Sequence, residues 1–425
     1  MTKEDFDPLA FTTAVNTLAV AIAQNLSEDE LALLTALPLM ACGIRAQELT
    51  RDIQPQGLDT STDLSAGGTA VTSFALSLLQ SSDAGRTARL LSPLSVLYAL
   101  GMTANGASGE TLKQIETAAG MSLTELNDYL YTFRMSLPAN SKSAKLSLAD
   151  SLWLRDVFRA EDDFLRACVN YYGAEVYRSA FDATLPSDVN AWVEKHTDGM
   201  IDAILPEEAP SELTMLYLIN AAAFDAKWET AYEKGSVLSG TFHSADGAEQ
   251  DAEFMWGEES IYLSGHGATG FLKPYAGGRY AFAALLPDEG TSLAELLSGL
   301  NGTKLYDLIN QHHYSKVETA LPKFTGSTEL ELIPALEAMG ITDLFDLSAA
   351  DLRSMGSAAN NSLYVSAVRH STFIEVDENG TRAAAVTAVE ANTKADDPGP
   401  KQQVVLDRPF LYMIVDTHAC LPIFV

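Results

Sequence analysis

The segment 381–394 has the side-chain pattern of a buried β-strand but is followed by the residues of an exposed loop. Every second residue from Thr381 to Thr393 is small and uncharged, and all the charges fall on the alternate set. Successive side chains of a strand point to opposite faces, so the segment could lie in a sheet with one tightly packed face and one solvated face. Residues 396–400 then read Asp-Asp-Pro-Gly-Pro, which ends a strand. The segment thus combines the pattern of a central strand with the ending of a loop.

The composition narrows the class of protein. The chain has 425 residues, of which 47% are hydrophobic and 20% charged, so it can bury a large core and is not a disordered chain. Its formal net charge of −30 argues against nucleic acid and anionic membranes as partners. No segment has the length of a membrane span. The cysteines are too few and too scattered for a disulfide framework or a zinc site, and the histidines show no metal-ligand spacing, so neither metal nor cofactor is expected.

Residues 1–53 form a candidate N-terminal extension. Helical spacing of apolar residues and a capping box of Ser27 and Glu30 predict a small helical hairpin there. The alternative is a lipoprotein signal ending at Cys42, although the residues before its apolar stretch are acidic where a signal needs Lys or Arg. Apart from that alternative, which leaves secretion or surface attachment open, no signal peptide is expected. Residues 54–68 are rich in Gly, Ser, Thr and Pro and predict a linker.

The main body, 69–425, mixes helices and strands without βαβ alternation, which indicates the α+β class. The segment 216–229 is nearly uncharged and predicts a long strand buried on both faces. The sequence has no nucleophile elbow, zinc-protease motif or P-loop. An enzyme is therefore not expected.

Several segments of this body resemble the serpin family of serine protease inhibitors, in the family's order. The hinge-like stretch EVDENGTRAAAVT begins at Glu375, and the remaining matches are LLSPLSVLYALGMTANGASGETLKQI, VNAWVEKHTDGMI, LINAAAFDAKWE, LPKF, PALEAMGITDLF, ADLRSM and DRPFLYMIVD. The resemblance implies a serpin fold, with a large central mixed β-sheet, further sheets, about eight or nine helices and an exposed reactive-centre loop at about 379–403.

The resemblance also implies a function that accounts for the two-sided segment. A serpin offers its loop to a protease as substrate, and the cut loop then inserts as a new strand of the central sheet. Insertion traps the protease as an acyl-enzyme, so the expected partner is a serine protease, bound covalently by a monomer. The alternative is a non-inhibitory serpin fold used for binding or storage. The residues expected to form the inserting hinge are Glu378, Gly380, Thr381, Ala383, Ala384 and Ala385.

The family's spacing from Gly380 places the reactive bond at Lys394–Ala395. A lysine before the bond suits a trypsin-like protease, whose primary pocket has a carboxylate at its base. The far side of the loop is longer than the family's usual length, which leaves Thr393 and Lys401 as alternatives.

Two further groups of residues match positions that control sheet opening in serpins. The shutter, a hydrogen-bonded cluster beneath the opening sheet, is expected to contain Ser92, Ser95, Asn220 and His370. The breach, where the loop first enters, is expected to contain Trp228 with Glu378. Asn379 begins a glycosylation sequon in the hinge, where a glycan would block insertion. Together with the scarce cysteines, this favours a bacterial origin.

Overall fold

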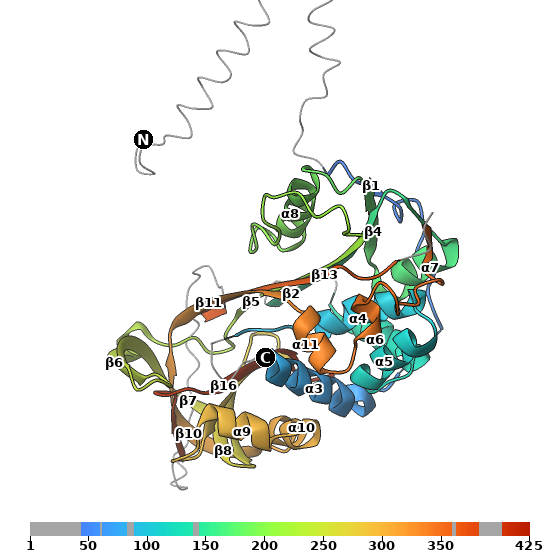
Figure 1. Cartoon of the computed structure of the whole chain (residues 1–425). Coiled ribbons are helices and arrows are strands. Elements are labelled where there is room, and N and C mark those ends of the chain that lie inside the picture. The colour runs from blue at the N-terminus through green and yellow to red at the C-terminus, as the bar shows by residue number, and fades with distance from the viewer. Residues whose placement is uncertain (1–43, 60–61, 83–88, 139–143, 359–362, 382–401) are drawn as a thin grey trace, which may run out of the picture. The chain divides into compact units, whose positions relative to one another are not determined.

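A seven-stranded mixed sheet is central to the fold (Figure 1). The structure, a computed structural model, describes residues 44–59, 62–82, 89–138, 144–358, 363–381 and 402–425. In spatial order the strands of this sheet are β1 (Gln47–Glu48), β4 (Glu175–Ser179), β2 (Ala144–Arg155), β5 (Leu216–Lys227), β14 (Gly380–Thr381), β13 (Ala367–Val376) and β11 (Phe324–Glu331).

A second, eight-stranded sheet contains the remaining long strands. Its order is β15 (Gln402–Val405), β10 (His313–Pro322), β7 (Glu249–Gly265), β8 (Ala268–Pro274), β9 (Tyr280–Pro287), β16 (Leu411–Asp416) and β17 (Leu421–Phe424), and β6 (Val237–His243) pairs with β7. A small third sheet joins β12 (Gly356–Ala358) to β3 (Phe158–Ala160).

Helices cover both faces of the seven-stranded sheet. Figure 1 shows α8 (Leu185–His196) on one side of the sheet and α4 (Pro93–Gly106) on the other. Every residue of α4 except Asn105 is buried, because the helix contacts β2 and β5 of one sheet and β17 of the other. The other α-helices of the described residues are α3 (Leu64–Ser81), α5 (Gly109–Ala119), α6 (Leu123–Ser136), α7 (Asp162–Ala167), α9 (Leu293–Gly299), α10 (Gly302–Asn310) and α11 (Ile333–Ala338).

The alanine-rich strand β5 is buried along most of its length, as its uncharged sequence predicts. Ala221, Ala222 and Ala223 are fully buried, and their small side chains allow helix and sheet to approach closely. The fold combines helices with two large sheets and is therefore α+β, the predicted class.

The structure differs from the sequence-based boundaries before residue 69. Residues 47–48 were expected to belong to the helical hairpin. They form the edge strand β1 instead, which is antiparallel to β4, with Gln47 opposite Arg178 and Glu48 opposite Tyr177. Helix α3 begins at Leu64, inside the expected linker, because the Asp63 side chain accepts the Ser65 backbone N–H at 3.0 Å and caps the helix. The rest of the predicted hairpin, with Ser27, Glu30 and Cys42, lies outside the described residues.

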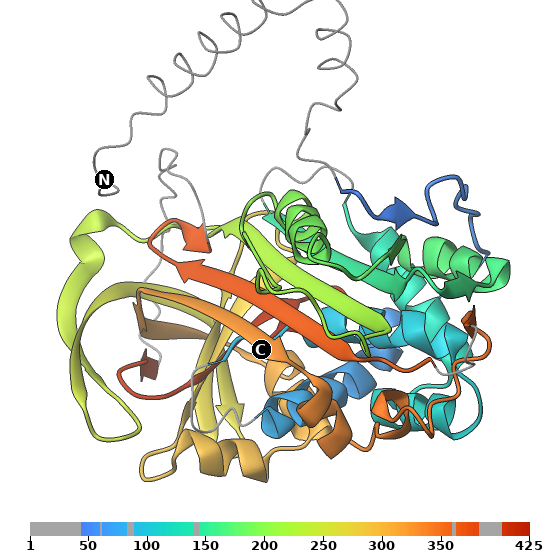
Figure 2. The same cartoon turned by 45° about the horizontal axis from the view of Figure 1, so that its top comes forward.

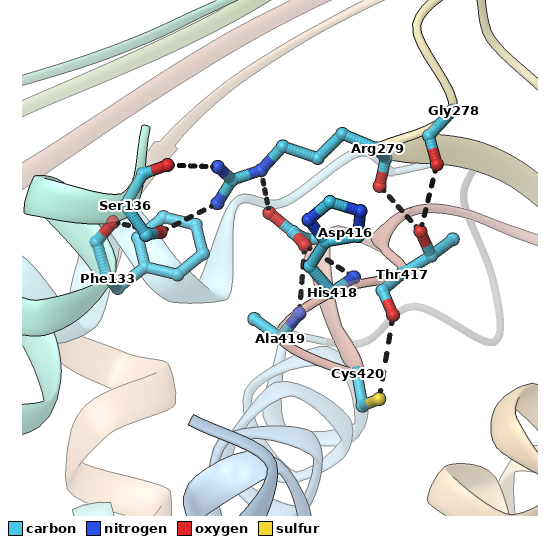
Figure 3. A network of polar contacts seen from close by, with 9 residues as sticks. All are labelled: Phe133, Ser136, Gly278, Arg279, Asp416, Thr417, His418, Ala419 and Cys420. Carbon is cyan, nitrogen blue, oxygen red and sulfur yellow. Dashed lines mark hydrogen bonds and ion pairs between the residues drawn. The ribbon is translucent and has the colours of Figure 1, made fainter. Parts of the chain in front are cut away.

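A buried carboxylate fixes the turn between β16 and β17 (Figure 3). Asp416 is fully buried and pairs with Arg279 at 2.6 Å, and its other oxygen accepts the backbone N–H groups of His418 and Ala419, each at 2.9 Å. The Arg279 guanidinium also donates to the Ser136 hydroxyl at 2.8 Å, which links the end of α6 to this turn. The turn directs β17 towards the start of α4, where Val425 exchanges two backbone hydrogen bonds with Leu91.

Candidate functional site

The line between β5 and β13 is the main candidate site (Figure 2). Over most of their length these two strands pair directly and in parallel, from Ala367 opposite Tyr217 to Phe373 opposite Ala223. At the end of this pair β14 lies between them and is antiparallel to both, with Thr381 opposite Ala226 of β5 and Val376 of β13. The sheet is therefore already separated at one end by the start of an additional strand.

The turn that leads into β14 is fixed by hydrogen bonds that its carbonyl groups accept from Trp228 and Tyr232. The carbonyl oxygens of Asp377 and Asn379 accept from the Trp228 indole and the Trp228 backbone, each at 2.9 Å, and the Glu378 carbonyl accepts from the Tyr232 backbone at 2.9 Å. These contacts bring together Trp228 and Glu378, which the family resemblance assigned to one region.

Gly380 is required by the close approach of β14 to β5. A Cβ at this position would lie 2.1 Å from the Ala226 carbonyl oxygen, so a larger residue would push the strands apart. The next residue, Thr381, is fully buried, and its hydroxyl lies 2.5 Å from the Tyr275 hydroxyl. The Thr381 side chain is thus already inside the sheet.

Charged side chains surround the entry of β14. Lys323 pairs with Glu378 at 2.8 Å, and this hydrogen bond holds the pKa of the Glu378 carboxyl below its usual value. Deeper in the protein, Lys273 pairs with Glu259 at 2.7 Å and lies 4.1 Å from the centre of the Tyr232 ring. Sequence reasoning missed the Lys273–Glu259 pair, because its residues are on different strands and no motif marks them.

The four predicted shutter residues form one buried cluster where α4 meets the sheet. The Asn220 side chain contacts the His370 ring on one side and the Ser95 hydroxyl on the other. The Ser92 backbone N–H donates to His370 Nε2 at 3.0 Å, and the Ser92 hydroxyl donates to the Ile423 carbonyl at 3.0 Å. Because Asn220 is on β5 and His370 on β13, the cluster bridges the two strands that would have to separate.

The contacts of His370 define its protonation state. Since Nε2 accepts from the Ser92 backbone, Nδ1 carries the proton and donates to Asn220 Oδ1. The ring is therefore neutral, which agrees with complete burial lowering the pKa of His370 to about 3.

Asp150 is a fifth member of this cluster that sequence reasoning missed. It lies opposite Asn220 in the β2–β5 pair, and its Oδ1 accepts from the Asn220 amide and, at 3.3 Å, from the Ser95 hydroxyl. Burial raises the pKa of Asp150 to about 8, although these two hydrogen bonds lower it. The available signal was an acidic residue in the otherwise uncharged stretch LADSLWL.

The predicted reactive bond lies outside the residues that the structure describes. The same holds for the alternatives Thr393 and Lys401 and for three of the predicted hinge residues. The residues concerned are Ala383, Ala384, Ala385, Thr393, Lys394, Ala395 and Lys401.

Two absences hold for the part of the chain that the structure describes. It contains no group of three His, Cys, Asp or Glu side chains placed to bind a metal ion. None of its helices is both long enough and apolar enough to cross a membrane.

Comparisons with known proteins match this architecture. The family model described as "Serpin (serine protease inhibitor)" matches residues 69–425. Neuroserpin of Gallus gallus is 31% identical over 342 residues, which cover 76% of this chain and 82% of neuroserpin.

Among solved structures, the thermophilic serpin tengpin in its native state is 41% identical, with a TM-score of 0.84 over 89% of this chain and 98% of that chain. Tengpin in its latent state is 39% identical, with a TM-score of 0.72 over 87% and 98%. The described fold is thus more similar to the native state than to the latent state.

Proposed function

Because the chain belongs to the serpin family of serine protease inhibitors, which are not enzymes, we propose that it inhibits serine proteases as a suicide substrate. The observation that carries this proposal is the position of β14 between β5 and β13. Thr381 is the first residue of the segment 381–394, in which every second side chain is small. If the rest of this segment continued β14 between β5 and β13, it would separate those two strands and complete a central strand. The small face would meet the packed side of the sheet.

The proposed chemistry is acyl transfer to the protease. The protease serine attacks the carbonyl carbon of Lys394, the Lys394–Ala395 bond breaks, and the new amino group of Ala395 leaves with a proton. Lys394 is then esterified to the serine. Two processes compete for this ester: water hydrolyses it and frees the protease, or the loop inserts and carries the protease away from the productive geometry.

The lysine at position 394 supports a trypsin-like target, with Thr393 and Lys401 as alternative residues before the bond. Insertion requires the Asn220–His370 hydrogen bond to break, since it joins β5 to β13. We assign Ser92, Ser95, Asn220 and His370 to the control of that opening, and Trp228 and Glu378 to the entry point. Ala383, Ala384 and Ala385 would follow Thr381 into the sheet.

We propose that the residues before the matched domain 69–425 form an N-terminal extension, of which β1 (Gln47–Glu48) and the start of α3 at Leu64 belong to the described fold, and that the inhibitory domain acts as a monomer. The hinge sequon supports a bacterial origin, because a glycan on Asn379 would have to be accommodated beside the buried Thr381. Secretion or surface attachment through Cys42 stays an alternative.

Mixing the protein with a panel of serine proteases tests the proposal. A trypsin-like protease is expected to give an adduct that survives boiling in detergent, because the link is an ester. The released C-terminal peptide is expected to begin at Ala395 by mass spectrometry. A peptide that begins elsewhere would refute the bond assignment, and complete turnover of the protein without any adduct would refute inhibition in favour of a non-inhibitory serpin.

A further inference from the structure

The hydroxyl groups of Tyr275 and Thr381 meet inside the protein. Their oxygens are 2.5 Å apart, and both side chains are fully buried. A buried hydroxyl group is costly unless it has a hydrogen-bond partner, so each of these two groups depends on the other.

Tyr275 is held in place from several directions. Its ring stacks on Trp228 at a centroid distance of 4.5 Å and meets the edge of Phe224 at 5.0 Å. Its backbone N–H donates to the Tyr280 carbonyl at 2.9 Å, and the Trp228 indole is itself bound to the hinge turn. These contacts fix the position of the tyrosine hydroxyl, so a hinge that left the sheet would lose its hydrogen bond to Tyr275.

We propose that Tyr275 is a positioning residue that holds Thr381 within the sheet before cleavage and thereby sets how fast the cut loop inserts. The inference rests on the function proposed above. Because the Gly380–Thr381 pair is already ordered between β5 and β13, the conformational entropy of starting the new strand has been lost before the protease arrives. Insertion then extends an existing strand end, which favours trapping over hydrolysis of the ester.

A double-mutant cycle tests the hydroxyl pair. Tyr275→Phe and Thr381→Val each leave one buried hydroxyl without its partner, and each is expected to lower the equilibrium constant for docking of the hinge roughly tenfold. The double variant replaces both partners by apolar groups of similar shape and is expected to behave nearly as the parent protein does.

Two readouts are measured on all four proteins. Amide hydrogen exchange of the peptide that contains residues 380–381 reports docking in the uncut protein. The number of inhibitor molecules consumed per trypsin molecule trapped reports the competition between insertion and hydrolysis. Each single variant is expected to show faster exchange and to consume several times more inhibitor, and the double variant is expected to recover both values.

Tyr129→Phe is the matched control, because it also removes a buried tyrosine hydroxyl, one that donates to the Leu64 carbonyl of α3 at 3.2 Å rather than to Thr381. It is expected to lower stability without changing either readout. If Tyr275→Phe leaves either exchange or inhibitor consumption unchanged while the parent protein still forms adducts, the inference alone is overturned. If the parent protein forms no adduct with any serine protease of the panel, the proposed function is overturned.

Discussion

At the residue scale, two buried titratable groups of one cluster make contributions to stability that change with pH in opposite directions. The folded pKa of Asp150, about 8, lies above its ordinary value of 3.8, so its contribution to stability is full at low pH and is lost as pH rises towards 8. The folded pKa of His370, about 3, lies below its ordinary value of 6.5, so its contribution is full above pH 6.5 and is lost as pH falls. The two effects oppose each other between about pH 4 and 6.5, and only that of Asp150 remains above this range.

Asp150→Asn separates these contributions. The parent protein is expected to lose stability between pH 6.5 and 8, with a slope from this residue of at most about 1.4 kcal/mol per pH unit. The variant keeps an acceptor for Asn220 and Ser95 but does not titrate, so its stability in this window is expected to lack that slope. Urea-unfolding midpoints at several pH values measure the difference. Identical pH profiles for the two proteins would show that Asp150 does not hold a proton in the fold.

The hinge gives a second residue-scale prediction, that Thr381→Arg converts the inhibitor into a substrate. Thr381 is fully buried between two strands, and an arginine there would place an unpaired charge in the sheet at a cost of several kcal/mol. Cleavage is expected at an unchanged initial rate, with full recovery of protease activity and no adduct. Arg382→Glu is the control, since the alternation of the segment places that residue on the opposite face, and it is expected to remain an inhibitor. Trapping by Thr381→Arg at the parent stoichiometry would contradict burial of this side chain during inhibition.

At the element scale, the sequence predicted the parts with a strong local pattern. The uncharged run of β5 and the α+β class follow from composition and periodicity, and the shutter residues came from the family resemblance. Asp150 was missed because a single acidic residue in a strand gives no local sign of the Asn220 and Ser95 side chains that meet it. The docking of Gly380 and Thr381 was missed because it depends on the spacing of β5 and β13, which no local pattern encodes. The start of α3 was placed too late, because the Gly, Ser, Thr and Pro content of 54–68 was interpreted as a linker and the helix cap at Asp63 was not considered.

The bridge between β5 and β13 gives an element-scale prediction for Asn220→Ala. Loss of the amide removes the partner of His370 and leaves buried groups of Asp150 and Ser95 with fewer hydrogen bonds, at a cost of about 1–3 kcal/mol. The two strands are then expected to separate on mild heating, which size-exclusion chromatography would detect as oligomers and an activity assay as lost inhibition. Asn105→Ala is the control, because Asn105 bonds to Asn127 between α4 and α6 and does not contact the β5–β13 line. Equal oligomer formation by both variants would remove the special role of the bridge.

At the scale of the whole molecule, the proposal requires the uncut fold to be metastable. An inserted strand would replace the direct pairing of β5 with β13 by two new pairings, one with each of these strands. The small face of 381–394 would then be packed against the core. About a dozen new ladder hydrogen bonds at about 1 kcal/mol each amount to roughly 10 kcal/mol, which is comparable with the stability of an entire domain. Cleavage anywhere in the loop beyond the hinge would release this free energy, whichever protease makes the cut.

The thermal midpoint before and after a single cleavage between residues 390 and 401 tests loop insertion most directly. At roughly 2–4 °C per kcal/mol, insertion is expected to raise the midpoint by tens of degrees. A scan of the intact and cleaved protein, with the cut verified by mass spectrometry, measures the change without requiring the natural target. An unchanged or lower midpoint in the cleaved protein would contradict insertion between β5 and β13.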